Sequence, residues 1–272
     1  MSTSSSVPKH RIGLYGLSAN PPTGLGGHQG VVRHLAQSGR FEEIWILPVY
    51  SHMYRSKRTM EDFSHRVNMC VMMFSGESTS TCAVRVSELE KEVWEKQQEC
   101  GTSDGSTVAL LQHLKTKHAT SNKTWHLVLG SDTYNDLVAG KWKSSAEILA
   151  SVDSLEVVLR KGYERSDANG EQVVVNVHAI PTLTLVSSTD VRQSLAQSNH
   201  DREKGGDKDE EDPDMLELHP SVAQYVLAHG LYRGAIYTTP VEGVGADACA
   251  LGLSAFALAL VVLGPVLGAL CS

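Results

Sequence analysis

Short apolar runs alternate with amphipathic segments along most of the chain. The runs have the length of β-strands, and they predict strands at residues 11–17, 42–50, 81–87, 124–131, 154–162 and 173–180. Segments with apolar residues at helical spacing predict helices at residues 28–38, 60–74, 107–118, 188–197 and 219–229. Strands that alternate with helices are typical of a parallel sheet with helices on both faces. The expected fold is therefore α/β, with a Rossmann-like doubly wound parallel sheet.

The same pattern predicts one folded domain over residues 11–236, preceded by a disordered stretch at residues 1–10. Two polar segments predict loops without regular structure, residues 97–106 and residues 198–214. Residues 201–214 hold eight acidic and three basic side chains, so much of the net charge of −7 belongs to this one segment. We interpret residues 198–214 as an acidic, disordered and solvated insertion.

The overall composition excludes some classes of protein. With 24 basic against 31 acidic residues, the chain lacks the basic balance of a general nucleic-acid binder. The five cysteines form no C-x-x-C pair, which argues against a zinc ribbon or a disulfide scaffold and indicates a reducing compartment.

Residues 248–271 form a run without any charged side chain. A helix needs about 20 apolar residues to cross a bilayer core, so this run is long enough. Because the first residues contain no apolar signal-peptide core, we expect a C-terminal apolar helix that serves as a tail anchor, with the domain facing the cytoplasm. The alternatives are a glycolipid-anchor signal and a terminal helix that is buried against the domain, which would leave the chain in the cytoplasm.

A glycine-rich turn follows the first predicted strand and ends at His28, where a helix begins. The turn contains neither G-x-G-x-x-G nor G-x-x-x-x-G-K-[ST], so it lacks the fingerprints of dinucleotide-binding dehydrogenases and P-loop proteins. Free N–H groups at a helix start bind phosphate, and a histidine there can donate a hydrogen bond to a phosphate oxygen. Alternatively, His28 is only a polar cap of the helix.

A second candidate site precedes the helix predicted at residues 188–197. Ser187, Ser188 and Thr189 lie at its start, and Arg192 falls within its first turns. Hydroxyl groups, helix N–H groups and a two-pronged guanidinium together suit a phosphate. An ordinary serine cap with a surface arginine would have the same sequence.

Taken together, the two segments resemble the signatures of the nucleotidylyl transferase superfamily, and more narrowly those of nicotinamide/nicotinate mononucleotide adenylyltransferases. The resemblance covers about residues 11–234 and includes further landmarks: Asn20-Pro21-Pro22-Thr23, His65-Arg66-Val67, Gly130-Ser131-Asp132, Trp142-Lys143-Ser144, Arg160, Ser187 through Arg192, and His219-Pro220 through Leu231-Tyr232. It implies a sheet of the nucleotidylyl transferase type.

The resemblance implies a reaction and its partners. The 5′-phosphate of nicotinamide or nicotinate mononucleotide attacks the α-phosphorus of ATP, which gives pyrophosphate and NAD or its acid form. Mg²⁺ would accompany ATP by bridging its phosphates. The resemblance implies no nucleic-acid partner. Because relatives commonly associate, both a monomer and a homo-oligomer are left as alternatives.

The resemblance also assigns roles to individual residues. His28, Lys57 and Arg192 would act on the reacting phosphates. ATP would be bound by these residues: Gly16, Ser18, Thr23, Gly27, His28, Gly130, Asp132, Ser187, Ser188, Thr189 and Arg192. The acceptor nucleotide would contact Tyr54, Lys57, Trp142 and Arg160, with Trp142 stacked on its ring. The alternatives are a partly buried core tryptophan for Trp142 and a surface charge at a strand end for Arg160.

Two rival functions remain open. One is transfer to another phosphate acceptor, such as a pantetheine or flavin phosphate, although the W-K-S segment and the closing L-Y argue against it. The other is a non-catalytic nucleotide-binding protein tethered to a membrane. The spacing from Thr23 to His28 is two residues longer than in the family pattern, which favours that second rival.

Overall fold

The computed structural model describes residues 9–50, 60–101, 106–159, 173–203 and 217–233. Its centre is a six-stranded, wholly parallel sheet with the strand order β3-β2-β1-β4-β5-β6. The strands are β1 (His10–Leu17), β2 (Glu43–Pro48), β3 (Ala83–Val86), β4 (Lys123–Gly130), β5 (Ser154–Val158) and β6 (Val174–His178). This order is the doubly wound arrangement that the alternating pattern predicts, so the expected fold class is confirmed.

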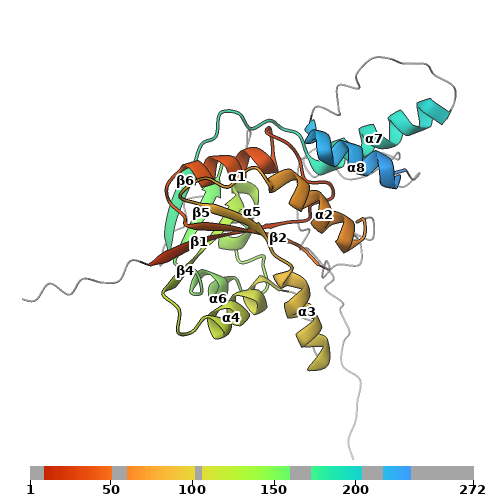
Figure 1. Cartoon of the computed structure of the whole chain (residues 1–272). Helices are drawn as coiled ribbons and strands as arrows, with labels where there is room; N and C mark the ends of the chain where they lie inside the picture. Colours follow the sequence, from red (N-terminus) through yellow and green to blue (C-terminus); the bar gives the residue numbers. More distant parts are fainter. Residues whose placement is uncertain (1–8, 51–59, 102–105, 160–172, 204–216, 234–272) are drawn as a thin grey trace, which may run out of the picture.

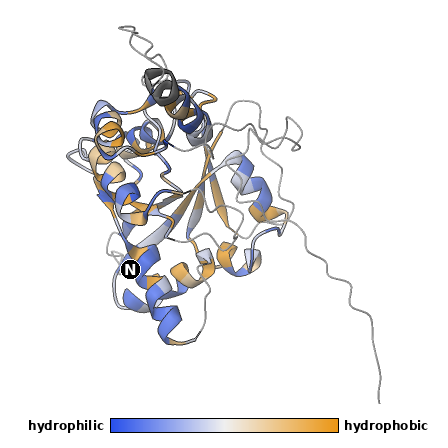
Figure 2. Ribbon diagram, turned by 90° about the vertical axis from the view of Figure 1, so that its right-hand side faces the viewer, coloured by the Kyte–Doolittle hydropathy of each residue, from blue (hydrophilic) through white to orange (hydrophobic). Residues whose placement is uncertain are grey.

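Helices cover both faces of the sheet, as Figure 1 shows. One face carries α1 (His28–Gln37), α2 (Phe63–Phe74), α7 (Ser188–Glu203) and α8 (Pro220–His229). The other carries α3 (Leu89–Glu99), α4 (Thr107–Lys117), α5 (Ser131–Val138) and α6 (Ser145–Leu149). In Figure 2 the strands are largely orange, while the helices show blue, hydrophilic stretches.

Alternation along the strands produces two hydrophobic cores. In β1, Ile12 and Leu14 belong to the core under α3 to α6, whereas Tyr15 and Leu17 belong to the core under α1 and α2. Successive side chains of a strand point to opposite faces, so a short apolar run supplies both cores. This burial on both faces explains why the strands read as continuous apolar runs.

Several boundaries differ from the sequence-based expectation. The segment Leu89–Glu99 forms helix α3, although residues 97–106 were expected to be a loop. Only Leu89 and Val93 of this helix are buried, so its apolar pattern is weak. Helix α7 continues to Glu203, into the segment expected to be unstructured, because neither Gly nor Pro interrupts Ser188–Glu203.

The first strand starts at His10, inside the stretch expected to be disordered. The His10 side chain lies 2.9 Å from a carboxylate oxygen of Glu43, and its backbone N–H donates to the carbonyl of Asn122 at 2.8 Å. These contacts extend the ladder by one residue. Strand β5 ends at Val158, short of the predicted strand 154–162, and residues 160–162 lie outside the described ranges.

Within the described ranges, no helix combines the length and the apolarity needed to cross a membrane. The run at 248–271, predicted as an apolar helix and tail anchor, lies outside these ranges, as do residues 204–214 of the acidic segment. Both stay predictions.

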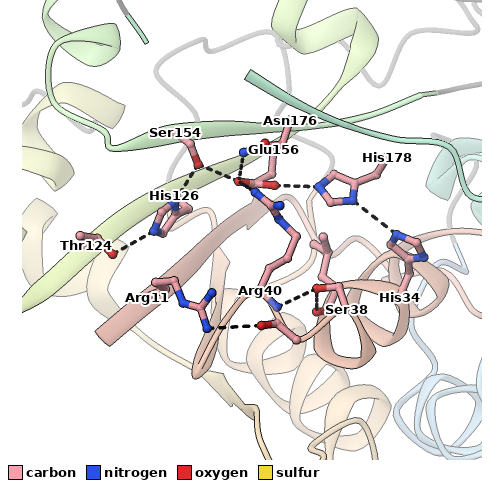
Figure 3. Close-up of polar contacts among 12 residues, drawn as sticks. Arg11, His34, Ser38, Arg40, Thr124, His126, Ser154, Glu156, Asn176 and His178 are labelled. Atoms are coloured by element: carbon pink, nitrogen blue, oxygen red, sulfur yellow. Dashed lines mark hydrogen bonds and ion pairs between the residues drawn. The ribbon is translucent and has the colours of Figure 1, made fainter. Parts of the chain in front are cut away.

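A buried polar cluster ties α1 to the edge of the sheet, as Figure 3 shows. Its centre is the fully buried carboxylate of Glu156 on β5, which accepts hydrogen bonds from Asn176 at 2.9 Å and Ser154 at 2.7 Å. His178 lies 2.7 Å from the other carboxylate oxygen, and Arg40, which follows α1, donates at 3.3 Å.

Burial alone would raise the pKa of Glu156. The hydrogen bonds from its neighbours, that from His178 first, outweigh this effect and lower the pKa to about 2. The carboxylate is therefore ionised, and its partners keep it stable inside the domain.

Candidate active site

The strand order places the candidate site. Strands β1 and β4 are neighbours, and the chain leaves them toward opposite faces, to α1 and to α5. In open α/β sheets, ligands bind at the carboxyl ends of the strands beside such a switch point. The glycine-rich turn after β1 and the Gly130-Ser131-Asp132 turn after β4 both lie at this edge.

Thr23 and His28 hold each other across the glycine-rich turn. The backbone N–H of Thr23 donates to Nδ1 of His28 at 3.0 Å, and the backbone N–H of His28 donates to Oγ1 of Thr23 at 3.1 Å. Thr23 Oγ1 also lies 2.7 Å from Nδ1. The longer spacing of this turn therefore leaves the two residues in contact, and α1 begins at His28.

Glycines in the turn and at the start of α1 permit close approaches of the backbone. A side chain on Gly27 would overlap Oγ1 of Thr23, and one on Gly30 would overlap the carbonyl oxygen of Leu25. The turn is also tied to the rest of the domain, because Gly24 N–H donates to the Glu217 carbonyl at 2.6 Å. These close approaches explain why the turn is rich in glycine.

The contact with Thr23 determines the tautomer of His28. A backbone N–H can only donate, so Nδ1 must be the acceptor. In the neutral ring the proton is then on Nε2. His28 is half-buried, and its imidazole can offer an N–H donor to an anion at the start of α1.

The second candidate segment begins α7 with a reciprocal cap. Ser187 Oγ donates to Oδ2 of Asp190 at 2.7 Å, and the backbone N–H of Asp190 donates to Ser187 Oγ at 3.2 Å. This arrangement orients the first turn of the helix. The N–H groups there suit an anion for the same reason as those of α1.

The structure brings the two candidate segments together. Ser188 Oγ donates to the carbonyl oxygen of Pro21 at 2.8 Å, and Arg192 Nη1 donates to the carbonyl oxygen of Asn20 at 2.6 Å. Arg192 Nη2 also donates to Oγ1 of Thr189 at 3.1 Å, which orients the guanidinium on α7. Segments separated by more than 160 residues therefore form one site.

The remaining predicted ATP contacts lie at the same edge of the sheet. Gly16 is exposed near the end of β1, and a Cβ there would meet nothing within 4 Å. The carbonyl of Ser18 accepts a hydrogen bond from Arg66. After β4, Gly130 is the N-cap of α5, and Asp132 is buried in the first turn of that helix.

The predicted acceptor contacts are described only in part. Trp142 is half-buried and packs against the core under α3 to α6. Tyr54, Lys57 and Arg160 lie outside the described residues. The acceptor roles of all four residues stay predictions.

Sequence reasoning gave no role in the site to Arg66 or Asn20. Arg66 is almost fully buried, and it donates to the carbonyls of Ser18 at 2.9 Å and Val49 at 2.6 Å, which follow β1 and β2. Burial lowers the pKa of its guanidinium. Arg66 thus cross-links the two chain segments that leave the sheet at the site, and the H-R-V motif was the signal that could have indicated it.

Among the residues that the structure describes, the candidate site gathers hydrogen-bond donors. His28, Arg192, hydroxyl groups and helix starts converge near the turn at 20–28, which suits the charge of phosphate groups. Within the described residues, no group of three or more His, Cys, Asp or Glu side chains could hold a metal ion. The arrangement can bind and align phosphates.

No protein-family model matches the chain. It is similar to curated proteins named "probable nicotinate-nucleotide adenylyltransferase". The protein from Desulfotalea psychrophila is 25% identical over 239 residues, which are 82% of this chain and 99% of that protein. The one from Methylibium petroleiphilum is 28% identical over 229 residues, which are 83% of this chain and 93% of that protein. The one from Chlorobaculum parvum is 25% identical over 225 residues, which are 82% of this chain and 99% of that protein.

Proposed function

We propose that this chain is a nicotinate/nicotinamide mononucleotide adenylyltransferase, the family to which its sequence is similar along most of its length. It transfers the adenylyl group of ATP to a pyridine mononucleotide in the synthesis of NAD. Since the relatives are named for nicotinate mononucleotide, this acid is the first acceptor to test. Nicotinamide mononucleotide is the second.

One observation carries the proposal. The turn that holds His28 and the helix that holds Arg192 are joined by the Ser188–Pro21 and Arg192–Asn20 hydrogen bonds. These are the two segments on which the family resemblance rests. Their junction lies at the carboxyl edge of the sheet, where a doubly wound fold binds nucleotides.

The reaction needs alignment more than activation. An oxygen of the acceptor's 5′-phosphate forms a bond to the α-phosphorus of ATP, and the bond to the bridging oxygen of pyrophosphate breaks. The acceptor oxygen is already anionic, so no side chain has to remove a proton from it. The protein therefore has to bring two anions together and balance the charge that develops on the leaving group.

The described residues suit this task. His28 would donate from Nε2 to a phosphate oxygen at the reacting end of ATP. Arg192, with Ser187, Ser188 and Thr189, would hold the β- and γ-phosphates at the start of α7. Gly16 leaves room for the nucleotide beside β1, and Asp132 would bind ribose hydroxyls or a water linked to Mg²⁺.

Mg²⁺ enters as part of the MgATP substrate in this proposal. It prefers phosphate oxygens and water, with few protein ligands, which fits a site of mainly cationic and hydroxyl donors. Lys57 and Tyr54 would complete the contacts to the phosphates and the acceptor. Trp142 would stack on the pyridine ring, and Arg160 would lie near the ring or its phosphate.

The test is a pyrophosphate-release assay on the full purified chain with MgATP. Parallel reactions contain nicotinate mononucleotide, nicotinamide mononucleotide, pantetheine phosphate, flavin mononucleotide, or no acceptor. Release with a pyridine mononucleotide, together with a dinucleotide of the expected mass, is the predicted result. ATP binding without release under any condition would contradict the proposal and favour a non-catalytic nucleotide-binding protein.

We further propose that the uncharged run at 248–271 attaches the enzyme to a membrane with the domain on the cytoplasmic side. The test is carbonate extraction of expressing cells, which leaves membrane-spanning proteins in the pellet. The Leu260→Arg variant is the matched control, since one charge at the centre of the run opposes insertion. Wild-type chain in the carbonate supernatant would contradict the attachment. Homo-oligomerisation stays a prediction for sedimentation analysis.

A further inference from the structure

Tyr232 reaches the first candidate segment from the other end of the domain. It follows α8 and is 1% exposed, and its hydroxyl donates to Oδ1 of Asn20 at 3.1 Å across 212 residues of sequence. Asn20 is likewise buried, at 3% exposure. A buried hydrogen bond between two such side chains has a well-defined geometry, because water does not compete for it.

Glu61 closes this contact into a three-residue clamp, which we define as Asn20, Glu61 and Tyr232. The backbone N–H of Glu61 donates to the same Asn20 Oδ1 at 3.0 Å. The carboxylate of Glu61 accepts from the backbone N–H of Tyr232 at 3.1 Å. Each member of the clamp therefore contacts the other two.

The clamp acts on the backbone that supports the phosphate site. The carbonyl of Asn20 is the acceptor for Arg192 at 2.6 Å, and the next carbonyl, that of Pro21, is the acceptor for Ser188 at 2.8 Å. A shift of the Asn20 side chain moves the peptide groups next to it. The clamp thus acts on one acceptor of the Arg192 guanidinium, which also donates to the Ser188 carbonyl and to Thr189.

We propose that Tyr232 is a positioning residue of the adenylyl-transfer site, which acts through Asn20 on Arg192. The inference rests on the proposed function, since Arg192 is assigned there to the ATP phosphates. A small displacement of an aligning group lowers the rate strongly, even where the fold is unchanged. Loss of the hydroxyl should therefore affect the use of ATP more than it affects stability.

The first test compares Tyr232→Phe with Tyr225→Phe in the full chain. Tyr225 is the matched control, because its hydroxyl contacts His65 Nδ1 at 2.8 Å and accepts from Asn68 at 3.1 Å, and it joins α8 to α2 without touching the clamp. We expect Tyr232→Phe to lower kcat/KM for ATP about tenfold and to leave KM for the mononucleotide within about twofold. Tyr225→Phe should leave both parameters within about twofold.

The second test asks whether Tyr232 acts through Arg192. In an Arg192→Ala background, Tyr232→Phe should lower kcat/KM for ATP less than about twofold, because the group that the clamp positions is gone. An equal tenfold loss in both backgrounds would overturn the inference. Unchanged ATP kinetics of Tyr232→Phe beside a lowered Tm would also overturn it and leave a purely structural tyrosine.

Glu61 provides a milder variant in case Tyr232→Phe does not fold. Glu61→Ala removes the acceptor for the Tyr232 N–H, whereas Glu61→Gln keeps an oxygen at that place. We expect a loss of about fivefold in kcat/KM for ATP with alanine and recovery to within about twofold with glutamine. Equal activity of the two variants would contradict the clamp.

A wild-type chain that binds ATP without releasing pyrophosphate would contradict the proposed function but leave the clamp testable. Calorimetric ATP binding then replaces kinetics, and Tyr232→Phe should weaken it several-fold relative to Tyr225→Phe. Equal affinities would overturn the inference. A wild-type chain that binds no ATP would overturn both proposals.

Discussion

The backbone N–H of Thr23 donates to Nδ1 of His28 at 3.0 Å, and in return the N–H of His28 donates to Oγ1 of Thr23 at 3.1 Å. This pair closes a turn that is longer than the family pattern. The extra residues therefore do not move the histidine away from the start of α1. In the neutral imidazole the proton is then on Nε2, and the first prediction rests on the proposed use of this N–H as a donor to a phosphate.

Substitution of His28 by alanine should lower kcat about 100-fold, because one donor to the developing charge is lost. KM for ATP should change much less, since ground-state contacts to the phosphates remain. The matched control is His34→Ala, at the other end of the same helix, where His34 Nε2 lies 3.4 Å from His178. Steady-state kinetics of both variants check the prediction, and an equal loss of kcat would contradict it.

A methyl group on Gly27 should disrupt the turn. The added Cβ would overlap Thr23 Oγ1, so Gly27→Ala has to break the Thr23–His28 contact or shift the turn. We expect a loss of about 2 kcal/mol in the free energy of unfolding and a large drop in kcat. Gly76→Ala is the control, because a Cβ there meets nothing within 4 Å. Urea denaturation and kinetics with ATP separate the two variants.

Arg192→Ala should lower kcat/KM for ATP about ten- to a hundredfold, because a charged contact to phosphate is worth about 1.5–3 kcal/mol. Arg192→Lys should recover little, since lysine cannot hold Thr189 and a phosphate with one planar group. Arg11→Ala, at the opposite end of β1, is the control with unchanged ATP kinetics. A wild-type value of kcat/KM in Arg192→Ala would contradict the proposed contact between Arg192 and the ATP phosphates.

Glu156→Gln should change how stability depends on pH. The pKa of Glu156 is about 2 in the folded domain, against an ordinary value of 4.5. Its contribution is therefore complete above about pH 4.5 and is lost as the pH falls toward about 2. This shift corresponds to about 3 kcal/mol at neutral pH.

We expect the difference in unfolding free energy between wild type and Glu156→Gln to be about 3 kcal/mol at pH 7 and to shrink below pH 4. Urea denaturation at several pH values measures it. Glu95→Gln, an exposed carboxylate 3.9 Å from Lys91, should stay within about 0.5 kcal/mol of wild type throughout. A pH-independent difference for Glu156→Gln would show that packing rather than charge is responsible.

The sequence predicted the strands and most helices because their apolar residues are local signals. It missed α3, in which only Leu89 and Val93 are buried and charged residues fill the remaining face. It also placed the end of α7 too early, because residues 198–203 carry no apolar pattern that would indicate a helix in the sequence. A helix or strand that buries a regular set of apolar residues can be predicted from the sequence. A helix that buries few residues cannot.

The candidate site was predicted as a set of residues but not as a geometry. The motifs around His28 and Arg192 indicated phosphate chemistry, yet no local pattern shows that Arg192 contacts the Asn20 carbonyl. Asn20 itself looked like part of a turn, and Tyr232 like the end of a helix motif. Their roles depend on contacts across 172 and 212 residues, which only the folded chain shows.

The contact between Tyr232 and Asn20 also bears on the order of events during synthesis. The turn at residues 16–28 leaves the ribosome early, whereas Arg192 and Tyr232, which contact Asn20, are translated 172 and 212 residues after it. A nascent chain that ends before residue 232 lacks the clamp, so the Asn20 side chain has no Tyr232 hydroxyl as its donor. Contacts between residues that are so far apart in the sequence also form slowly. The contacts that hold Asn20 are therefore among the later ones to form as this chain is made.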